Sequence, residues 1–245
     1  MATLTQNVEA TRPLILYRAD AGVAVITMDD PPANTYTHEM MRQMDDAILR
    51  ARMDNDVHVI VLTGSGDKFF SAGANIRMLS SVDPTFKYYF CLHANETLLR
   101  LEHTPKLVIA ALNGHTVGGG LEIAMAADLR IGRDGTADKV GLPEINLGVL
   151  PGTGGTQRLS RLIGKSKAIE LMITGHTFSM EEAKDYGIVN DLYPKEGFLE
   201  SVMEYARQFC PPNKAAKAVG RIKRAVQSGL EMSLEQGLAF ERELQ

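Results

Sequence analysis

The sequence predicts an α/β fold built from repeated strand–strand–helix units and followed by a C-terminal helical segment. Short apolar runs of strand length alternate along the 245-residue chain with longer stretches whose apolar residues recur at helical spacing. Glycine-rich turns separate several of these runs from the helix that follows. Only helical patterns remain beyond Pro194. We therefore divide the chain into a core that carries the candidate site, residues 1–194, and a helical segment, residues 195–245.

The elements of the first half are marked by apolar runs and by one clear helix cap. Paired prolines at 31 and 32 end the first two strands, because proline cannot donate to a sheet. Thr37 can cap a helix whose Met40, Met44 and Ile48 recur on one face. A helix is also expected across residues 88–99. The expected strands are 14–18, 23–28, 57–63 and 107–112, with turns at 19–22 and 68–76.

The second half begins with Gly118-Gly119-Gly120, which opens a short buried helix at 121–128. A second glycine-rich loop, residues 151–156, opens a helix that ends at Gly164. Ser179 with Glu182 and Ser233 with Gln236 form capping-box patterns, and the first of these helices stops at Gly187. Further strands are expected at 129–132, 139–142 and 188–193, and Pro211-Pro212 separates two helices of the terminal segment.

The last helix has few apolar partners in the rest of the chain. Either it docks on another subunit, or the native chain continues beyond Gln245. The first ten residues lack the basic and apolar regions of a secretory signal and the arginine-rich pattern of a transit peptide. We therefore expect a cytoplasmic protein.

The composition is that of an ordinary globular domain, with 44% hydrophobic and 23% charged residues. A net charge of −4 argues against nucleic acid as the main partner. Charges or glycines break every apolar run well short of the ~20 residues that a membrane span needs. Cys91 and Cys210 are expected as reduced thiols, and neither they nor the six histidines show metal-ligand spacing, so no metal site is expected.

The triple glycine carries the first sign of chemistry. It leaves backbone N–H groups uncovered at the positive end of a helix, and Glu122 follows in the first turn. Such a place suits a developing negative charge, as in enolate chemistry. The structural alternative is a turn that needs glycine only for close packing.

Two further pieces belong with this turn. Ala72-Gly73-Ala74 follows another strand, so N–H groups from two strand ends can converge on one oxygen. Glu122 and Glu144 can divide proton transfer between them if their environments separate their pKa values. The alternative is that Glu122 caps its own helix and that Glu144 pairs with Arg130 or Arg158.

Four ordered motifs resemble the crotonase (enoyl-CoA hydratase/isomerase) superfamily. They are Phe70-Ser71-Ala72-Gly73-Ala74-Asn75-Ile76, the run from Ala111 through Gly118-Gly119-Gly120 to Glu122, the run Leu142-Pro143-Glu144-Ile145-Asn146-Leu147-Gly148, and the run from Pro151 to Leu159. The resemblance extends from about residue 14 to the end of the chain. It implies a crotonase-type superhelix of strand–strand–helix units, with the C-terminal helical segment serving oligomerisation as a homotrimer or hexamer.

The resemblance also implies roles for individual residues. The backbone N–H groups of Ala74 and Gly119 would form the oxyanion hole for a thioester. Glu122 would be the catalytic base and Glu144 the catalytic acid, and the N–H of Gly152 would orient the water. Contacts with the substrate or its CoA portion are implied at Ala72, Gly73, Asn75, Ile76 and Gly118.

The implied activity is the reversible hydration of 2-enoyl-CoA thioesters to 3-hydroxyacyl-CoA, with no cofactor because coenzyme A is part of the substrate. The alternatives are an enoyl-CoA double-bond isomerase, another crotonase-fold acyl-CoA lyase or hydratase, and a non-catalytic binding protein. Asn75 replaces an aspartate common in hydratases, and no basic residue precedes Pro31. Lys68, Arg77 and Lys106 are therefore candidate partners for the CoA phosphates, the alternative being ordinary solvated charges. Met78, Tyr88, Leu92 and Leu121 are candidates for the acyl pocket or, equally, for the core.

Overall fold

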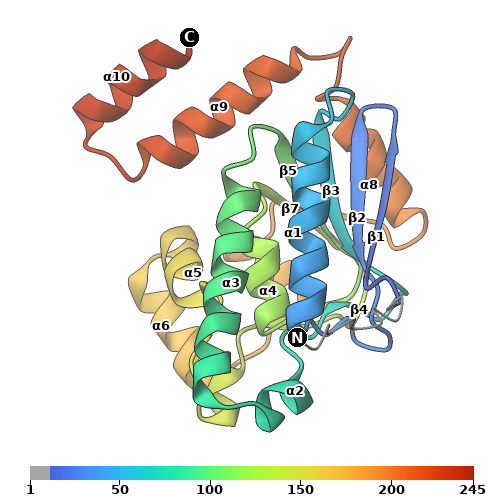
Figure 1. The fold of residues 1–245 in the computed structure, drawn as a ribbon, viewed down its shortest axis with the longest axis vertical. Coiled ribbons are helices and arrows are strands. Elements are labelled where there is room, and N and C mark those ends of the chain that lie inside the picture. Colours follow the sequence, from blue (N-terminus) through green and yellow to red (C-terminus); the bar gives the residue numbers. More distant parts are fainter. Residues whose placement is uncertain (1–11) are drawn as a thin grey trace, which may run out of the picture.

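The computed structural model of the chain describes residues 12–245 (Figure 1). Its main sheet has the strand order β1-β2-β3-β5-β7-β9, in which only the β1–β2 pair is antiparallel. The strands are β1 (Ile15–Asp20), β2 (Val23–Met28), β3 (Val59–Gly64), β5 (Leu107–Leu112), β7 (Leu129–Arg133) and β9 (Asp191–Tyr193). The predicted strands of the main sheet are thus confirmed, with ends that differ by up to three residues.

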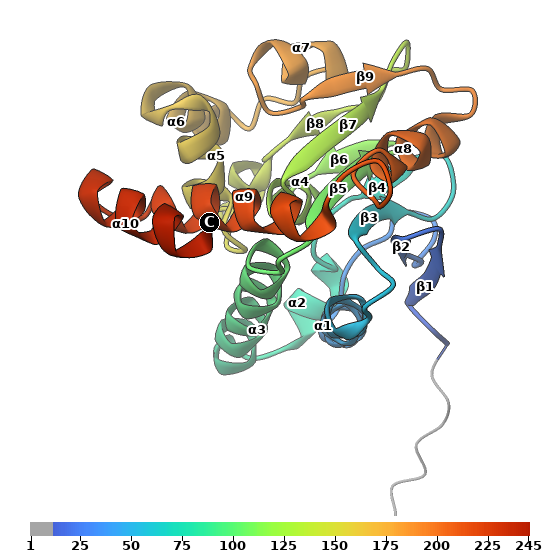
Figure 2. The same cartoon turned by 90° about the horizontal axis from the view of Figure 1, so that it is seen from above.

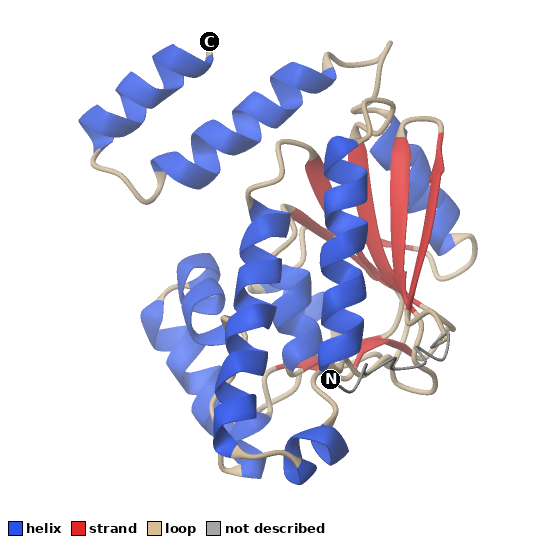
Figure 3. Ribbon diagram, viewed as in Figure 1, coloured by secondary structure: helices blue, strands red, loops and turns tan. Residues whose placement is uncertain are grey.

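A second, parallel sheet of three short strands crosses one end of the main sheet and has the order β4-β6-β8 (Figure 3). Its strands are β4 (Phe69–Ser71), β6 (His115–Val117) and β8 (Val140–Gly141). The prediction that 68–76 is wholly a turn was wrong, and β6 was not predicted. Strands of two or three residues are too short to show a period of two.

Helices cover both faces of the main sheet (Figure 2). Their bounds are α1 (His38–Met53), α2 (Ile76–Ser81), α3 (Pro84–Glu102), α4 (Gly119–Met125), α5 (Gly155–Ile163), α6 (Lys165–Thr174), α7 (Met180–Asp185), α8 (Phe198–Arg207), α9 (Ala216–Gly229) and α10 (Leu234–Leu244), with a short 3₁₀ helix η1 (Glu144–Leu147). Thr37, Ser179 and Ser233 cap helices as predicted. The helix α6 was not predicted. Gly164 is both the C-cap of α5 and the N-cap of α6, so the sequence carries no separate signal for the start of α6.

Two hydrophobic cores lie on opposite faces of the main sheet. Ile26 and Ile60 belong to the core shared with α1, α3 and α4, and Val25 and Val61 belong to the core shared with α8. Because both faces are covered, the central strands are apolar without interruption. The helix α8, although it follows residue 194, packs on the sheet, so the division of the chain at that residue stays a prediction.

The helices α9 and α10 form an antiparallel pair in which α9 contacts β5 and α10 packs on α9 (Figures 1 and 2). This pair exposes several large apolar side chains, including Ile222, Leu230 and Leu234, with Leu230 at 80% exposure. The predicted lack of apolar partners for the last helix is therefore confirmed within residues 12–245. Among the helices of residues 12–245, none combines the length and the hydrophobicity that a membrane span requires.

Candidate active site

The first turn of the site follows β4 and includes Ala74. Its main chain pairs with the segment before α1: Tyr36 N donates to Gly73 O (2.9 Å), and Asn75 N donates to Tyr36 O (3.0 Å). This parallel bridge uses the groups on either side of Ala74. The N–H of Ala74 itself has no acceptor among the described residues. It is therefore free to donate to a ligand.

The second turn follows β6 and opens α4. Gly118 N donates to Gly141 O (2.9 Å), and Gly118 has a φ of +57°, which L side chains rarely adopt. The helix begins at the next residue, Gly119, whose N–H likewise lacks an acceptor within residues 12–245. The sequence prediction of uncovered N–H groups at this helix start is consistent with that geometry.

The two turns touch each other. A Cβ added to Gly73, which has a φ of +91°, would lie 2.7 Å from Gly119 N, and one added to Gly120 would overlap Ser71 O. Side chains at these positions would push the turns apart. Close packing thus explains the glycines, and the same contact brings the turns that carry the Ala74 and Gly119 N–H groups side by side.

Glu122 lies in the first turn of α4 and is 2% exposed. Its Oε1 accepts hydrogen bonds from Thr153 N (2.8 Å) and Gly155 N (2.7 Å), at the start of α5. The alternative in which Glu122 caps its own helix is therefore wrong.

Opposing influences act on the charge of Glu122. Burial raises the pKa of Glu122, and the N–H groups of Gly155 and Thr153 lower it. The charge of Arg158 also lowers that pKa. Burial outweighs these influences, so the pKa of Glu122 lies above its ordinary value, and the N–H donors together with the positive end of α5 limit that rise.

Glu144 begins η1 and faces the glycine turn from the other side. A Cβ added to Gly118 would lie 3.1 Å from Glu144 Oε1, and Glu144 Oε2 is buried without a hydrogen-bond partner among the described residues. Burial, and then the charge of Glu122, raise the pKa of Glu144 to about 7. A carboxyl group with that pKa is partly protonated at neutral pH and can donate a proton.

The alternative partners predicted for Glu144 are engaged elsewhere. Arg130 donates to Ile188 O (2.6 Å) and Ala127 O (2.7 Å). Arg158 forms a buried ion pair with Glu102 (2.7 Å) and donates to Thr153 O (3.0 Å). Neither arginine neutralises Glu144.

The loop that contains Gly152 closes the site beside Glu122. Gly152 O accepts a hydrogen bond from Asn95 (3.2 Å), and a Cβ on Gly152 would be 3.8 Å from Cys91 Sγ. Burial, and then the charge of Glu122, raise the pKa of the Cys91 thiol, so this thiol stays protonated.

The residues predicted to bind the substrate or the CoA phosphates lie in several different elements. Asn75 caps α2, where its Oδ1 accepts from Met78 N (3.0 Å), and the Ile76 side chain is 58% exposed. Lys106 donates to Ala51 O (2.6 Å) and Asp54 O (2.5 Å), so its ammonium is already occupied by carbonyls. Leu121 is fully buried in the core, whereas Tyr88 is 66% exposed.

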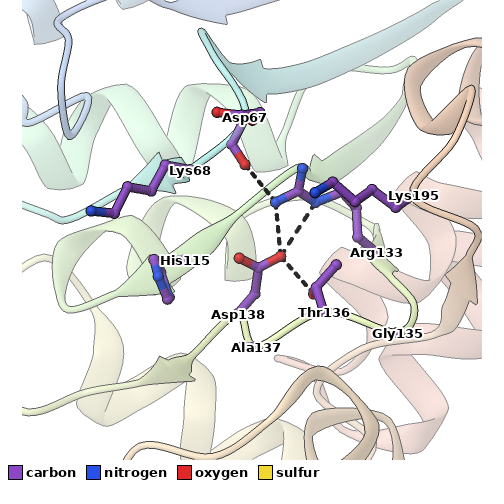
Figure 4. Close-up of a pocket in the computed structure, with 9 residues that line it drawn as sticks. All are labelled: Asp67, Lys68, His115, Arg133, Gly135, Thr136, Ala137, Asp138 and Lys195. Carbon is purple, nitrogen blue, oxygen red and sulfur yellow. Dashed lines mark hydrogen bonds and ion pairs between the residues drawn. The ribbon is translucent and has the colours of Figure 1, made fainter.

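Lys68 lies apart from the glutamates, in a cavity of about 470 Å³ (Figure 4). An ion pair between Arg133 and Asp138 (2.9 Å) forms its wall, and Thr136 donates to the same carboxylate (2.7 Å). Arg133 also donates to Asp67 O (2.6 Å). These side chains are hydrogen-bonded to one another and to the main chain, so we assign them a structural role. No group of three or more possible metal-binding side chains occurs in residues 12–245.

Sequence reasoning missed Tyr36 and Thr153, which are both buried beside Glu122. The Tyr36 hydroxyl and Thr153 Oγ1 are 2.9 Å apart. Thr153 stood in a predicted glycine-rich loop, but nothing in the pattern distinguished it. Tyr36 precedes the helix cap Thr37, a position that carries no recognisable signal.

Comparison with known proteins gives a consistent result. The family model described as enoyl-CoA hydratase/isomerase matches residues 18–245. A short-chain-enoyl-CoA hydratase of Clostridium acetobutylicum is 36% identical over 230 residues, which cover 94% of this chain and 87% of that protein. A probable enoyl-CoA hydratase of Mycobacterium tuberculosis is 39% identical over 235 residues, or 96% and 89% of the two chains.

Solved structures agree with these relatives. The crystal structure of an enoyl-CoA hydratase of Geobacillus kaustophilus HTA426 aligns with a TM-score of 0.92 and 45% identity, and the match covers 95% of this chain and 87% of that one. An enoyl-CoA hydratase of Bacillus anthracis aligns with a TM-score of 0.89 and 31% identity, and the match covers 94% and 89%. The predicted crotonase-type fold is thereby confirmed.

Proposed function

Because the chain belongs to the enoyl-CoA hydratase/isomerase family and is an enzyme of the enoyl-CoA hydratase type, we propose that it hydrates 2-enoyl-CoA thioesters reversibly to 3-hydroxyacyl-CoA with two glutamates and two backbone amides. One observation carries the mechanism. The free N–H groups of Ala74 and Gly119 lie on touching turns, and Glu144 faces the second of these turns with one unpartnered oxygen.

The oxyanion hole comes first. The thioester carbonyl oxygen accepts hydrogen bonds from the N–H groups of Ala74 and Gly119, and negative charge grows on this oxygen as an enolate forms. The positive end of α4 adds to the stabilisation. Each donor of this kind lowers the barrier by about 3 kcal/mol in other enzymes.

Proton transfer is divided between the glutamates. Ionised Glu122 removes a proton from water while the water oxygen bonds to the β-carbon, and the electron pair of the double bond moves into the enolate. Protonated Glu144 then gives its proton to the α-carbon, and the carbonyl reforms. Different hydrogen bonding of the two carboxyl groups supports this assignment. Burial raises the pKa of both, but Glu122 accepts hydrogen bonds from two N–H groups that favour its charge, whereas Glu144 Oε2 has no partner among the described residues.

The remaining assignments stay predictions. We propose that the N–H of Gly152 orients the water, and that Ala72, Gly73, Asn75, Ile76 and Gly118 line the path of the thioester. The reaction requires no cofactor beyond the coenzyme A of the substrate. Arg77 is the better candidate for the CoA phosphates, because the Lys106 ammonium is bound to carbonyls. A cytoplasmic location and a homotrimer or hexamer also belong to this proposal.

The main alternative is a double-bond isomerase. Isomerisation moves one proton between carbons and needs no carboxylate to activate water, so the buried Glu122 favours hydration. A lyase or a hydratase specialised for other acyl groups would use the same oxyanion hole.

The direct test is the ultraviolet absorbance of crotonyl-CoA after enzyme is added. Loss of the enoyl absorbance, with 3-hydroxybutyryl-CoA identified by mass spectrometry, supports hydration. Glu144→Gln should abolish turnover while CoA-thioester binding changes by no more than a few-fold. Because the enzyme could require an acyl group other than crotonyl, the assay is repeated with enoyl-CoA thioesters of several chain lengths. If no member of the panel is hydrated, the proposal fails.

A further inference from the structure

Tyr36 is buried, at 1% exposure, between the first turn of the site and the helix α1. Its main chain forms the parallel bridge with Ala74 described above, with hydrogen bonds to Gly73 O and from Asn75 N. These two bonds fix the backbone on both sides of Ala74. The direction of the Ala74 N–H therefore depends on the backbone of Tyr36.

The ring of Tyr36 supports the second turn. A Cβ added to Gly119 would overlap the Tyr36 hydroxyl and would lie 2.6 Å from Cε1 of the ring. The ring also stacks on Phe90, with centroids 5.8 Å apart and an interplanar angle of 27°. Gly119 thus rests directly on a ring that cannot easily move.

The hydroxyl of Tyr36 continues the contact to Glu122. It lies 2.9 Å from Thr153 Oγ1, and Thr153 N donates to Glu122 Oε1 (2.8 Å). Thr153 is 3% exposed, so water does not compete for these bonds. One side chain thereby reaches all three parts of the site: the Ala74 turn, the Gly119 turn and the loop that holds Glu122.

We propose that Tyr36 is a positioning residue of the hydration reaction, which sets the spacing of the Ala74 and Gly119 N–H groups and, through the Thr153 hydroxyl, the orientation and charge of Glu122. This inference rests on the proposed function. Tyr36 itself does not touch the reacting atoms.

The charges around Glu122 define how the hydroxyl acts. Arg158, Cys91 and Glu144 face Glu122 from α5, α3 and η1, and Tyr36 faces it from the segment before α1. Burial, followed by the charge of Glu122, raises the pKa of Tyr36, so its hydroxyl keeps its proton. When Tyr36 donates to Thr153 Oγ1, the Thr153 hydroxyl keeps its own proton for a hydrogen bond to the Glu122 carboxylate, a contact that lowers the pKa of Glu122 against the effect of burial.

The test is Tyr36→Phe, which removes the hydroxyl and keeps the ring. We expect kcat for crotonyl-CoA to fall about three- to tenfold, the size of one neutral hydrogen bond, with KM changed by less than about twofold. The acid limb of the pH profile should move to higher pH, because the Thr153 hydroxyl is no longer polarised by the Tyr36 O–H and stabilises the charge of Glu122 less strongly. Tyr17→Phe is the matched control: Tyr17 carries a buried hydroxyl without a partner in the described part of the chain, and it lies on β1.

A double-variant cycle separates positioning from a general loss of stability. Thr153→Val should reproduce the effect, Thr153→Ser should restore most of the activity, and Tyr36→Phe with Thr153→Val should be no slower than Thr153→Val alone. Unchanged kcat and an unchanged acid limb in Tyr36→Phe, with active wild type, would overturn the inference and leave the hydratase function intact.

A measurement that does not depend on turnover tests the role of Tyr36 even if the wild type hydrates no enoyl-CoA. Titration of 13C-labelled glutamate carboxyl groups by NMR should show a higher pKa for Glu122 in Tyr36→Phe than in the wild type and in Tyr17→Phe. If the wild type hydrates no enoyl-CoA, the proposed function fails, and this titration still decides whether Tyr36 controls Glu122. Identical titration curves would refute that control.

Discussion

Arg158 and Glu102 hold the active-site loop through a two-bond ion pair. Arg158 Nε is 2.8 Å from Glu102 Oε1 and Nη2 is 2.7 Å from Oε2, and both side chains are 12% exposed. The third nitrogen, Nη1, donates to Thr153 O (3.0 Å). Because the N–H of Thr153 bonds Glu122, the C-terminal end of α3 is connected through this pair to the proposed base.

Breaking this pair should weaken both the fold and the reaction. Glu102→Gln leaves the Arg158 guanidinium buried without its counter-charge, and we expect the free energy of unfolding to fall by about 3 kcal/mol. Activity should also fall, because the loop at Thr153 loses its anchor. Urea denaturation measures the first effect. Glu231→Gln is the control: it breaks an exposed pair with Arg161 and should change the free energy by less than about 1 kcal/mol. Equal losses in the two variants would contradict the prediction.

The pKa of Glu144 predicts how the rate depends on pH. Hydration needs Glu144 protonated, and burial together with the charge of Glu122 raises its pKa to about 7. The protonated fraction therefore falls as the pH rises through about 7, and kcat/KM for hydration should fall with it on the alkaline side. On the acid side the rate should fall as Glu122 becomes protonated. The two glutamates are coupled, so the profile reports the pair. A flat profile between about pH 6 and 9 would contradict the assigned roles.

The contact between the two turns predicts a strong effect of a single methyl group. In Gly73→Ala the new Cβ would lie 2.7 Å from Gly119 N, and the turns must separate. We expect the hydration rate to fall at least about 100-fold, as it does when an oxyanion donor is misplaced. Gly187→Ala is the matched control, because Gly187 also has a positive φ (+79°) but open space around it. Gly187→Ala should lose stability through backbone strain and keep the wild-type kcat. If Gly73→Ala and Gly187→Ala had comparable activities, steric contact between the two turns could not be the cause of the loss.

The elements that were predicted well are those that depend on local chemistry. The strands β2, β3 and β5 are covered on both faces, so their sequences are continuously apolar and their positions could be predicted within two residues. Thr37, Ser179 and Ser233 lie next to the N–H groups that they cap. The strands β4 and β6 and the helix α6 lacked such signals.

The site was only partly readable for a different reason. The glycines and glutamates appear as motifs in the sequence. The motifs do not show that Glu144 Oε2 is left without a hydrogen-bond partner, because in the folded chain Arg130 and Arg158 bind other groups. The hydrogen bond between Tyr36 and Thr153 joins positions separated by 117 residues. Contacts of that kind depend on the packed fold and leave no pattern in the sequence.

The last prediction concerns the anchor of α9. Lys223 Nζ is 2.9 Å from Asp128 Oδ2, with side-chain exposures of 5% and 16%, and it also donates to Lys106 O (3.0 Å). In Lys223→Met the Asp128 carboxylate is left buried without its counter-charge, although Val108 N still donates to it (2.7 Å). We expect the free energy of unfolding to fall by about 3 kcal/mol.

Hydrogen exchange locates the effect of this substitution. Amides of α9 should exchange faster in Lys223→Met, because the helix loses its buried attachment to the core. Adding Asp128→Asn should restore part of the stability, since it removes the unpaired charge and keeps an oxygen for Val108 N. Lys217→Met, which changes an exposed lysine on the same helix, controls for the loss of a positive charge. If both lysine variants left α9 equally protected, the helix would have to be held by its apolar contacts, with no measurable contribution from the ion pair.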